Sequence, residues 1–173
     1  FEADTGSNHY ILTQEMPAIS CFLSTVSGSI MDFYKFAGIT RTVSSQIPYD
    51  RTALRDLLSV RYFLQDAQMP ADSGDSAQEL LSAYQSVTKE NGYFVYENKN
   101  YLHMGTIFSY YMKRSEYETL SETQKDTVLL HAMVIEDKDC ENLEISPRVT
   151  LLSAEDFKEM TKDSRPEDDE NAQ

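Results

Sequence analysis

The sequence is short of basic residues and of glycine, and each shortage argues against a class of protein. Its 173 residues include 15 Lys and Arg against 29 Asp and Glu, which gives a net charge of −14 at neutral pH. Nucleic acids and anionic lipid surfaces attract basic proteins, so this charge argues against both as partners. The six glycines do not cluster, so no glycine-rich loop of the kind that holds phosphate is present.

Long hydrophobic runs and cysteines are equally scarce. The longest stretch without a charged residue, Met16 to Met31, is rich in Ser and Thr and is too polar to span a membrane. The two cysteines, Cys21 and Cys140, lie far apart and fit no metal-site spacing. A disulfide between them stays open for an oxidising compartment, and two isolated buried thiols are the expectation we favour.

Hydrophobic residues nevertheless make up 40% of the chain, which is enough for a folded core. Residue patterns predict strands at 19–24, 60–64, 84–89, 93–96, 102–112 and 148–152, and helices that begin after Ser27, Asp50, Ser115, Ser121 and Ser153. A further short helix is expected at 77–83 and an acidic loop at 136–141. Asn91-Gly92 separates two of the strands and favours a tight hairpin turn.

Interleaved strands and helices around an antiparallel hairpin predict an α/β (α+β) fold, a mixed β-sheet with a central antiparallel hairpin flanked by helices. We expect a single domain over residues 1–160 and an acidic disordered tail over 161–173. The sequence starts at Phe1 without an initiator Met or a signal peptide, and we expect it to be a piece of a longer protein.

Catalytic and metal-binding patterns are weak in this chain. Ser86-Val87-Thr88-Lys89 matches the Ser-x-x-Lys pattern, but that chemistry places the pair on a helix and here it falls in a predicted strand. The three histidines are scattered through the sequence. The pattern Asp137-x-Asp139 is expected by chance in so acidic a chain. We therefore predict no catalytic residue, no metal site and no cofactor.

One segment is locally positive. From Lys35 to Arg61 there are five basic residues, Arg51 and Arg55 among them. Such a cluster suits a phosphate or an anionic polymer. The interpretation we favour is that Arg51 and Arg55 lie on the exposed face of a helix and pair with nearby Asp.

Four segments in order resemble one protein family. Ala53 to Leu64 resembles an "LLgvKY" segment, Gly92 to Asn98 a "vYEN" segment, Tyr101 to Gly105 an "LPlG" segment with His103 in place of Pro, and Glu116 to Val134 a helix that ends in "LLkaaV". Together they cover most of residues 18–135, and they resemble the YfhO family of bacterial membrane proteins. The part beyond about residue 140 carries no such resemblance.

The resemblance implies that this chain is the extracellular domain of an integral membrane protein. The family is similar to GT-C-like membrane glycosyltransferases that use polyprenyl-phosphate sugars, and some members are linked to lipoteichoic acid of the Gram-positive cell envelope. The catalytic carboxylates are then expected in the membrane portion of the parent chain, which would be this domain's partner. The fragment itself is expected to be inactive.

Binding residues are expected within the matching segments. Arg51, Arg55 and Arg61 would meet a polyprenyl-phosphate sugar or an anionic envelope polymer, and Glu97 and Asn98 match the motif beside them. The alternative we favour for Arg61, Glu97 and Asn98 is that they join a helix, a strand and the hairpin by hydrogen bonds. Two other functions stay open: an extracellular binding module of a membrane-anchored protein, and, less favoured, a small hydrolase.

Overall fold

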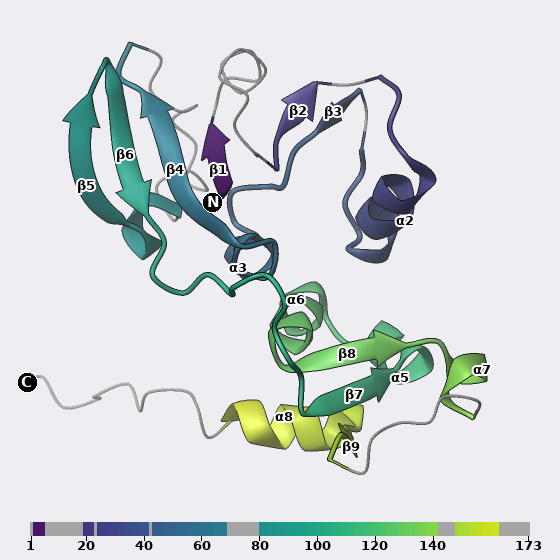
Figure 1. The fold of residues 1–173 in the computed structure, drawn as a ribbon. Coiled ribbons are helices and arrows are strands. Elements are labelled where there is room, and N and C mark those ends of the chain that lie inside the picture. Colours follow the sequence, from purple (N-terminus) through teal and green to yellow (C-terminus); the bar gives the residue numbers. More distant parts are fainter. Residues whose placement is uncertain are drawn as a thin grey trace, which may run out of the picture. The chain divides into compact units, whose positions relative to one another are not determined.

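The computed structural model describes residues 2–5, 19–22, 24–41, 43–68, 80–141 and 148–162. The chain forms two compact units, residues 1–106 and residues 107–173. Figure 1 shows the elements of each unit coloured along the sequence. The single domain expected over residues 1–160 stays a prediction, and the expected tail lies outside the described residues from residue 163 onward.

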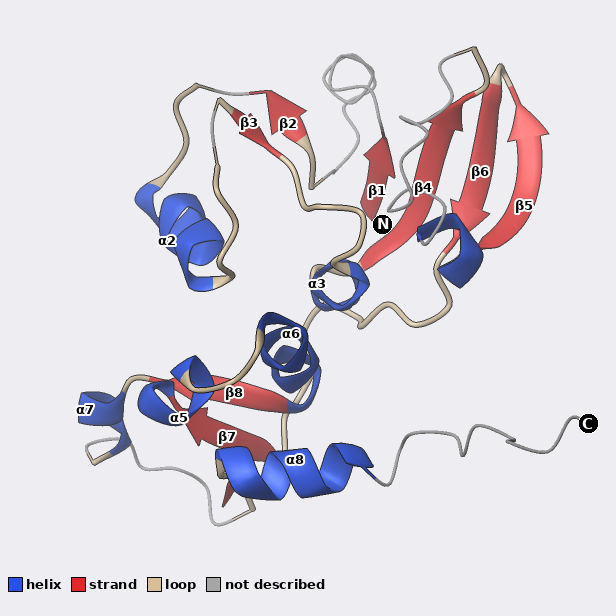
Figure 2. Ribbon diagram, turned by 180° about the vertical axis from the view of Figure 1, so that it is seen from behind, coloured by secondary structure: helices blue, strands red, loops and turns tan. Residues whose placement is uncertain are grey.

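The first unit contains a four-stranded mixed sheet, and it confirms the predicted α+β class. Its strands, in spatial order, are β1 (Glu2–Thr5), β4 (Val60–Asp66), β6 (Tyr93–Glu97) and β5 (Gln85–Glu90). β1 is parallel to β4, whereas β6 is antiparallel to both of its neighbours. Figure 2 shows the four strands side by side with β5 at the edge. Every residue of β5 is exposed, as is typical of an edge strand that carries charged side chains.

The hairpin between β5 and β6 is confirmed at the predicted turn. Asn91 and Gly92 have φ angles of 50° and 83°, the left-handed values that a two-residue hairpin turn requires. The turn pairs Glu90 with Tyr93, and a register shift between Ser86 and Thr88 brings Gln85 opposite Glu97. The free end of β6 is therefore carried to the base of the sheet, where β4 begins.

The remaining elements of the first unit are short. β2 (Cys21–Phe22) pairs with β3 (Ser44–Ser45), so two of the described residues in the strand expected over 19–24 are in a strand. α2 (Gly28–Phe36) follows Ser27 as predicted. α3 (Thr52–Leu57) has Arg51 at its N-cap, so the predicted cap at Asp50 is wrong.

The core of the first unit lies against the sheet. Phe63 of β4 packs with Leu80 and Tyr84, and Tyr49 and Tyr96 lie around them. The rings of Tyr49 and Phe63 meet edge to face with centroids 5.8 Å apart. Burying one such aromatic side chain stabilises the fold by roughly 1.5–3 kcal/mol. Residues 80–83 are helical, and the rest of the helix expected at 77–83 lies outside the described residues.

The second unit is a three-stranded parallel sheet with helices. Its elements are β7 (Tyr110–Lys113), α5 (Arg114–Glu118), α6 (Glu122–His131), β8 (Ala132–Ile135), α7 (Asp137–Cys140), β9 (Thr150–Leu151) and α8 (Ala154–Lys162). β7 lies between β8 and β9 and is parallel to both. Parallel neighbours need crossover connections, and α5 with α6 supplies the one between β7 and β8.

Local predictions for the second unit succeed at one capping box and fail at another. The Ser121 hydroxyl accepts from the Gln124 amide while the Gln124 side chain accepts from the Ser121 amide, which confirms that capping box. The box expected at Ser115 is wrong, because α5 already begins at Arg114.

The strand expected over 102–112 begins only at Tyr110, and α7 occupies the expected acidic loop. Cys140, at the end of α7, is a free and partly buried thiol.

The hairpin turn yields a first prediction. We expect Gly92→Ala to lower the free energy of unfolding by about 1 kcal/mol, because alanine resists the left-handed backbone. Gly92 has a φ of 83°, and a methyl group added at its Cα would meet no atom within 4 Å, so the loss comes from the backbone alone. Denaturant unfolding followed by circular dichroism measures it.

Gly28 provides the matched control. It also has open space around an added Cβ, but it lies in ordinary backbone at the start of α2. Gly28→Ala should leave stability unchanged or raise it slightly, because alanine favours a helix. Equal losses at the two positions would contradict the explanation.

Candidate functional site

Two of the predicted binding residues donate hydrogen bonds to backbone carbonyls of the first unit. Arg55 of α3 is fully buried, and its Nη2 donates to the Ile47 carbonyl at 2.7 Å. Its guanidinium carbon lies 5.2 Å from the centroid of the Tyr49 ring. Arg51 donates from Nη2 to the Ala37 carbonyl at 2.8 Å. Both arginines thus tie α3 to the preceding segment, and the expectation that Arg55 lies on an exposed helix face is wrong.

The other three predicted residues meet where β4 begins and β6 ends. Arg61 of β4 donates from Nε and Nη2 to one oxygen, Oε1 of Glu97, at 3.1 and 2.9 Å. The Lys99 ammonium forms an ion pair with the second oxygen, Oε2. One carboxylate on β6 therefore holds two cations, and we call these three residues the Arg61–Glu97–Lys99 triad.

Two tyrosine rings lie beside the triad. The guanidinium carbon of Arg61 is 5.1 Å from the Tyr62 ring centroid and 5.5 Å from that of Tyr101, distances at which a cation is attracted to a ring. Tyr101 in turn meets His103 edge to face at 4.9 Å. The Arg61 side chain is 39% exposed, and no acceptor among the described residues pairs with its Nη1. A positioned donor is therefore presented to solvent between aromatic rings.

Asn98 holds this arrangement in place from below the surface. Its side chain is buried, and Nδ2 donates to Oδ1 of Asp56 at 2.6 Å and to the Val60 carbonyl at 3.0 Å. Its Oδ1 accepts from the Asn100 amide at 2.9 Å. One side-chain amide thus joins the end of α3, the start of β4 and the segment after β6.

The backbone completes the same junction. The Asn98 amide donates to the Arg61 carbonyl at 2.8 Å, and the Leu102 amide donates to the Asp56 carbonyl at 2.9 Å. These bonds fix the segment 98–102 against β4 and α3. Tyr101 lies in that segment, so its place beside Arg61 follows from the buried hydrogen bonds.

Two carboxyl pKa values of the site are shifted in opposite directions, one by hydrogen bonds and one by burial. The hydrogen bonds from Lys99 and then Arg61 lower the pKa of Glu97 below its ordinary value of 4.5. The same pairing with Glu97 raises the pKa of Arg61. Burial raises the pKa of Asp56 above 3.8, and the hydrogen bond from Asn98 offsets part of that rise.

Sequence reasoning found Arg61, Glu97 and Asn98 but missed three neighbours. Lys99, Tyr62 and Tyr101 complete the surface group, and each stands next to a matched segment or within one. Across the described ranges, no three His, Cys, Asp or Glu side chains are placed to hold a metal ion. The arrangement suits recognition of a polar ligand by a guanidinium and flat aromatic faces.

Fold and site together define an α+β chain with a candidate ligand-contacting surface. The sequence matches the family described as "Bacterial membrane protein YfhO" over residues 9–172, nearly its whole length, so the chain belongs to the YfhO family. Within the described part of the chain, none of the helices has the length and apolar character needed to cross a membrane. No curated protein and no solved structure matches the chain.

The lowered pKa of Glu97 predicts a pH-dependent contribution to stability. Ionised Glu97 is favoured in the folded state, so its pairing stabilises the fold above pH 4.5 and is lost as the pH falls through the lowered value. Glu97→Gln should lower the free energy of unfolding at pH 7, with a difference that shrinks below pH 4.5. Urea unfolding over a pH series measures this. Glu90→Gln, on exposed β5 and without an ion pair to a described residue, should show no such trend.

Asp56 should behave in the opposite way. Its raised pKa means that the folded state favours the neutral acid. The contribution of Asp56 to the stability of the fold is therefore full below pH 3.8 and is lost as the pH rises through the raised value. Asp56→Asn keeps the shape without the charge and should raise the free energy of unfolding at pH 7, but not below pH 3.8. Asp50→Asn, at an exposed position before α3, is the control. A loss of stability in Asp56→Asn at pH 7 would contradict the pKa direction.

Proposed function

We propose that this chain is the extracellular, non-catalytic domain of a YfhO-family membrane protein. In this proposal the parent protein glycosylates cell-envelope polymers such as lipoteichoic acid from a polyprenyl-phosphate sugar, through a GT-C-like membrane portion. The observation that carries the proposal is the family match over residues 9–172. The transmembrane portion of the same parent chain is the partner of this domain and supplies the reacting groups.

Within the domain, we propose Arg61 as the contact with the sugar or the polymer. Arg51 and Arg55 donate to backbone carbonyls, whereas Arg61 is partly exposed and keeps Nη1 without an acceptor among the described residues. A guanidinium pairs well with phosphate oxygens and with hydroxyl groups. Tyr62 and Tyr101 add apolar ring faces of the kind that accompany polar anchors in ligand sites.

Glu97 and Asn98 serve this contact indirectly in the proposal. Glu97 orients the guanidinium through two hydrogen bonds, and Asn98 fixes the segment that carries Tyr101. Both side chains are largely buried, so they position the surface group rather than touch a large polymer. The ligand contact then consists of one cation and two rings.

The test uses the full-length membrane protein in its native membrane. Arg61→Gln should reduce glycosylation of the envelope polymer about tenfold, the effect of losing a charge-assisted hydrogen bond. Polymer-bound sugar is measured by mass spectrometry, and the level of the protein in the membrane is measured in parallel. If Arg61→Gln fails to accumulate, Tyr101→Ala removes one ring of the same contact without breaking the ion pair.

Arg114→Gln provides the matched control. Its side chain is 33% exposed, close to the value for Arg61, but its nitrogens pair with Glu118 and Glu136 in the second unit. We expect this variant to glycosylate normally. Full glycosylation by accumulated Arg61→Gln and Tyr101→Ala would refute the contact, and full glycosylation by a parent protein that lacks residues 1–162 would refute the proposed function.

A further inference from the structure

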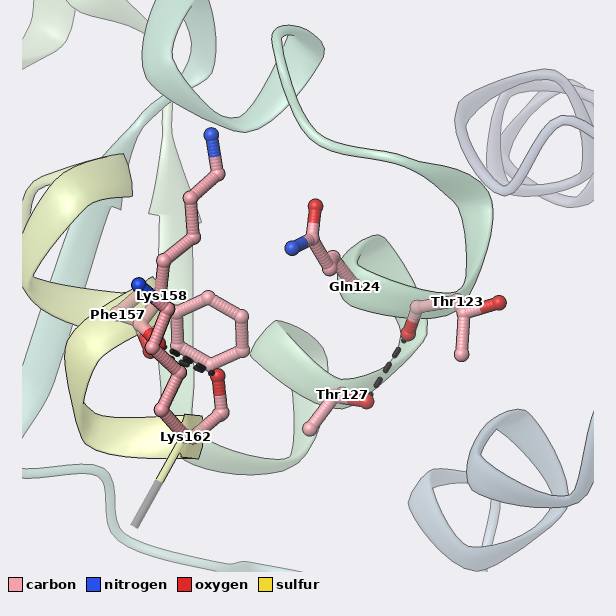
Figure 3. A pocket seen from close by; sticks show the side chains of 7 residues that line it. Thr123, Gln124, Thr127, Phe157, Lys158 and Lys162 are labelled. Atoms are coloured by element: carbon pink, nitrogen blue, oxygen red, sulfur yellow. Dashed lines mark hydrogen bonds between the residues drawn. The ribbon is translucent and has the colours of Figure 1, made fainter. Parts of the chain in front are cut away.

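A cavity lined by both polar and apolar groups lies between two helices of the second unit. It has a volume of about 510 Å³, within the range of small-molecule sites. α6 and α8 supply its lining, and Figure 3 shows Gln124 of α6 and Lys158 of α8 on opposite sides of the same space. The lining residues are Thr123, Gln124, Thr127, Phe157, Lys158, Thr161 and Lys162.

The charge of this cavity is opposite to that of the chain. Acidic residues outnumber basic ones by 29 to 15 in the sequence, yet Lys158 and Lys162 line the cavity and no carboxylate does among the described residues. Neither lysine forms an ion pair with a described residue. Two like charges one helical turn apart repel each other by roughly 0.2–0.5 kcal/mol. An anion between them would relieve that repulsion.

The uncharged lining groups have hydrogen-bonding capacity left over. The Thr127 hydroxyl donates to the Thr123 carbonyl at 2.9 Å and the Thr161 hydroxyl to the Phe157 carbonyl at 3.0 Å. Each hydroxyl oxygen can still accept. The Gln124 carbonyl oxygen is used in the capping box, which leaves its NH₂ group as a donor. The cavity therefore combines two cations with acceptors and a donor for hydroxyl groups, over a floor formed by the buried Phe157 ring.

We propose that this cavity binds a small phosphate ester that carries hydroxyl groups. A phosphomonoester has a charge of roughly −1.5 to −2 at neutral pH. Two ammonium groups together carry a matching positive charge, whereas a single carboxylate would neutralise only one of them. Lys158 and Lys162 hold the phosphate, and the threonine hydroxyls and the Gln124 amide bind the polyol. The site is independent of the proposed glycosylation function, because it rests on the second unit alone.

Calorimetry on the whole chain tests the proposal at low ionic strength. Inorganic phosphate should bind at one saturable site, and glycerol 3-phosphate should bind more tightly than inorganic phosphate because it adds hydroxyl contacts. Lys158→Gln with Lys162→Gln should weaken both at least tenfold. Thr127→Val should weaken glycerol 3-phosphate severalfold and leave inorganic phosphate unchanged, which separates the polyol contacts from the charge.

Lys35→Gln with Lys138→Gln is the control for net charge. It removes the same number of positive charges, one from α2 and one from α7, and neither residue lines the cavity. This variant should bind both probes as the unmodified chain does. Thermal unfolding of each variant establishes that it is folded. Absence of saturable phosphate binding to the unmodified chain, or equal weakening in the control, overturns the proposal.

Discussion

The buried side-chain amide of Asn98 is the interaction on which the candidate site depends. It satisfies Asp56, the Val60 carbonyl and the Asn100 amide at once, so it joins α3, β4 and the segment after β6. A buried polar group that lost these partners would cost about 1–3 kcal/mol, which makes the alternative arrangements of this junction unfavourable. Because these hydrogen bonds tie the segment after β6 to β4 and α3, Tyr101 lies beside Arg61 although they are 40 residues apart in sequence (101 − 61).

Electrostatics give the two candidate sites different characters. At the first site, Glu97 holds Arg61 and Lys99 together, so the carboxylate between them orients both cations and compensates one of the two positive charges. In the cavity of the second unit, Lys158 and Lys162 have no carboxylate among the described lining residues. A chain with a net charge of −14 repels anions at long range, so only local arrangements of this kind can bind one.

Predictions from the sequence succeeded where a few neighbouring residues decide the structure. Asn91-Gly92 adopts the expected turn because both residues tolerate a positive φ, and the Ser121 box forms because its two hydrogen bonds lie within one turn of helix. Ser115 matches the same pattern but lies inside α5, since the chain leaves β7 and enters the helix one residue earlier. The expected strand over 102–112 fails at its start, where the Leu102 amide bonds to Asp56 and Gly105 turns with a φ of 83°.

The sequence by itself determined the family, the α+β class, the hairpin and three of the residues at the candidate site. Those features depend on local patterns of side chains and on short matched segments. The tertiary structure alone decided that Arg55 is buried against Tyr49, that Tyr62 and Tyr101 flank Arg61, and that two lysines share a cavity with α6. The reason is physical: these outcomes depend on how side chains pack in space, and Arg61 with Tyr101, or α6 with α8, join segments distant in the sequence. The period of a single helix or strand carries no information about its packing partner.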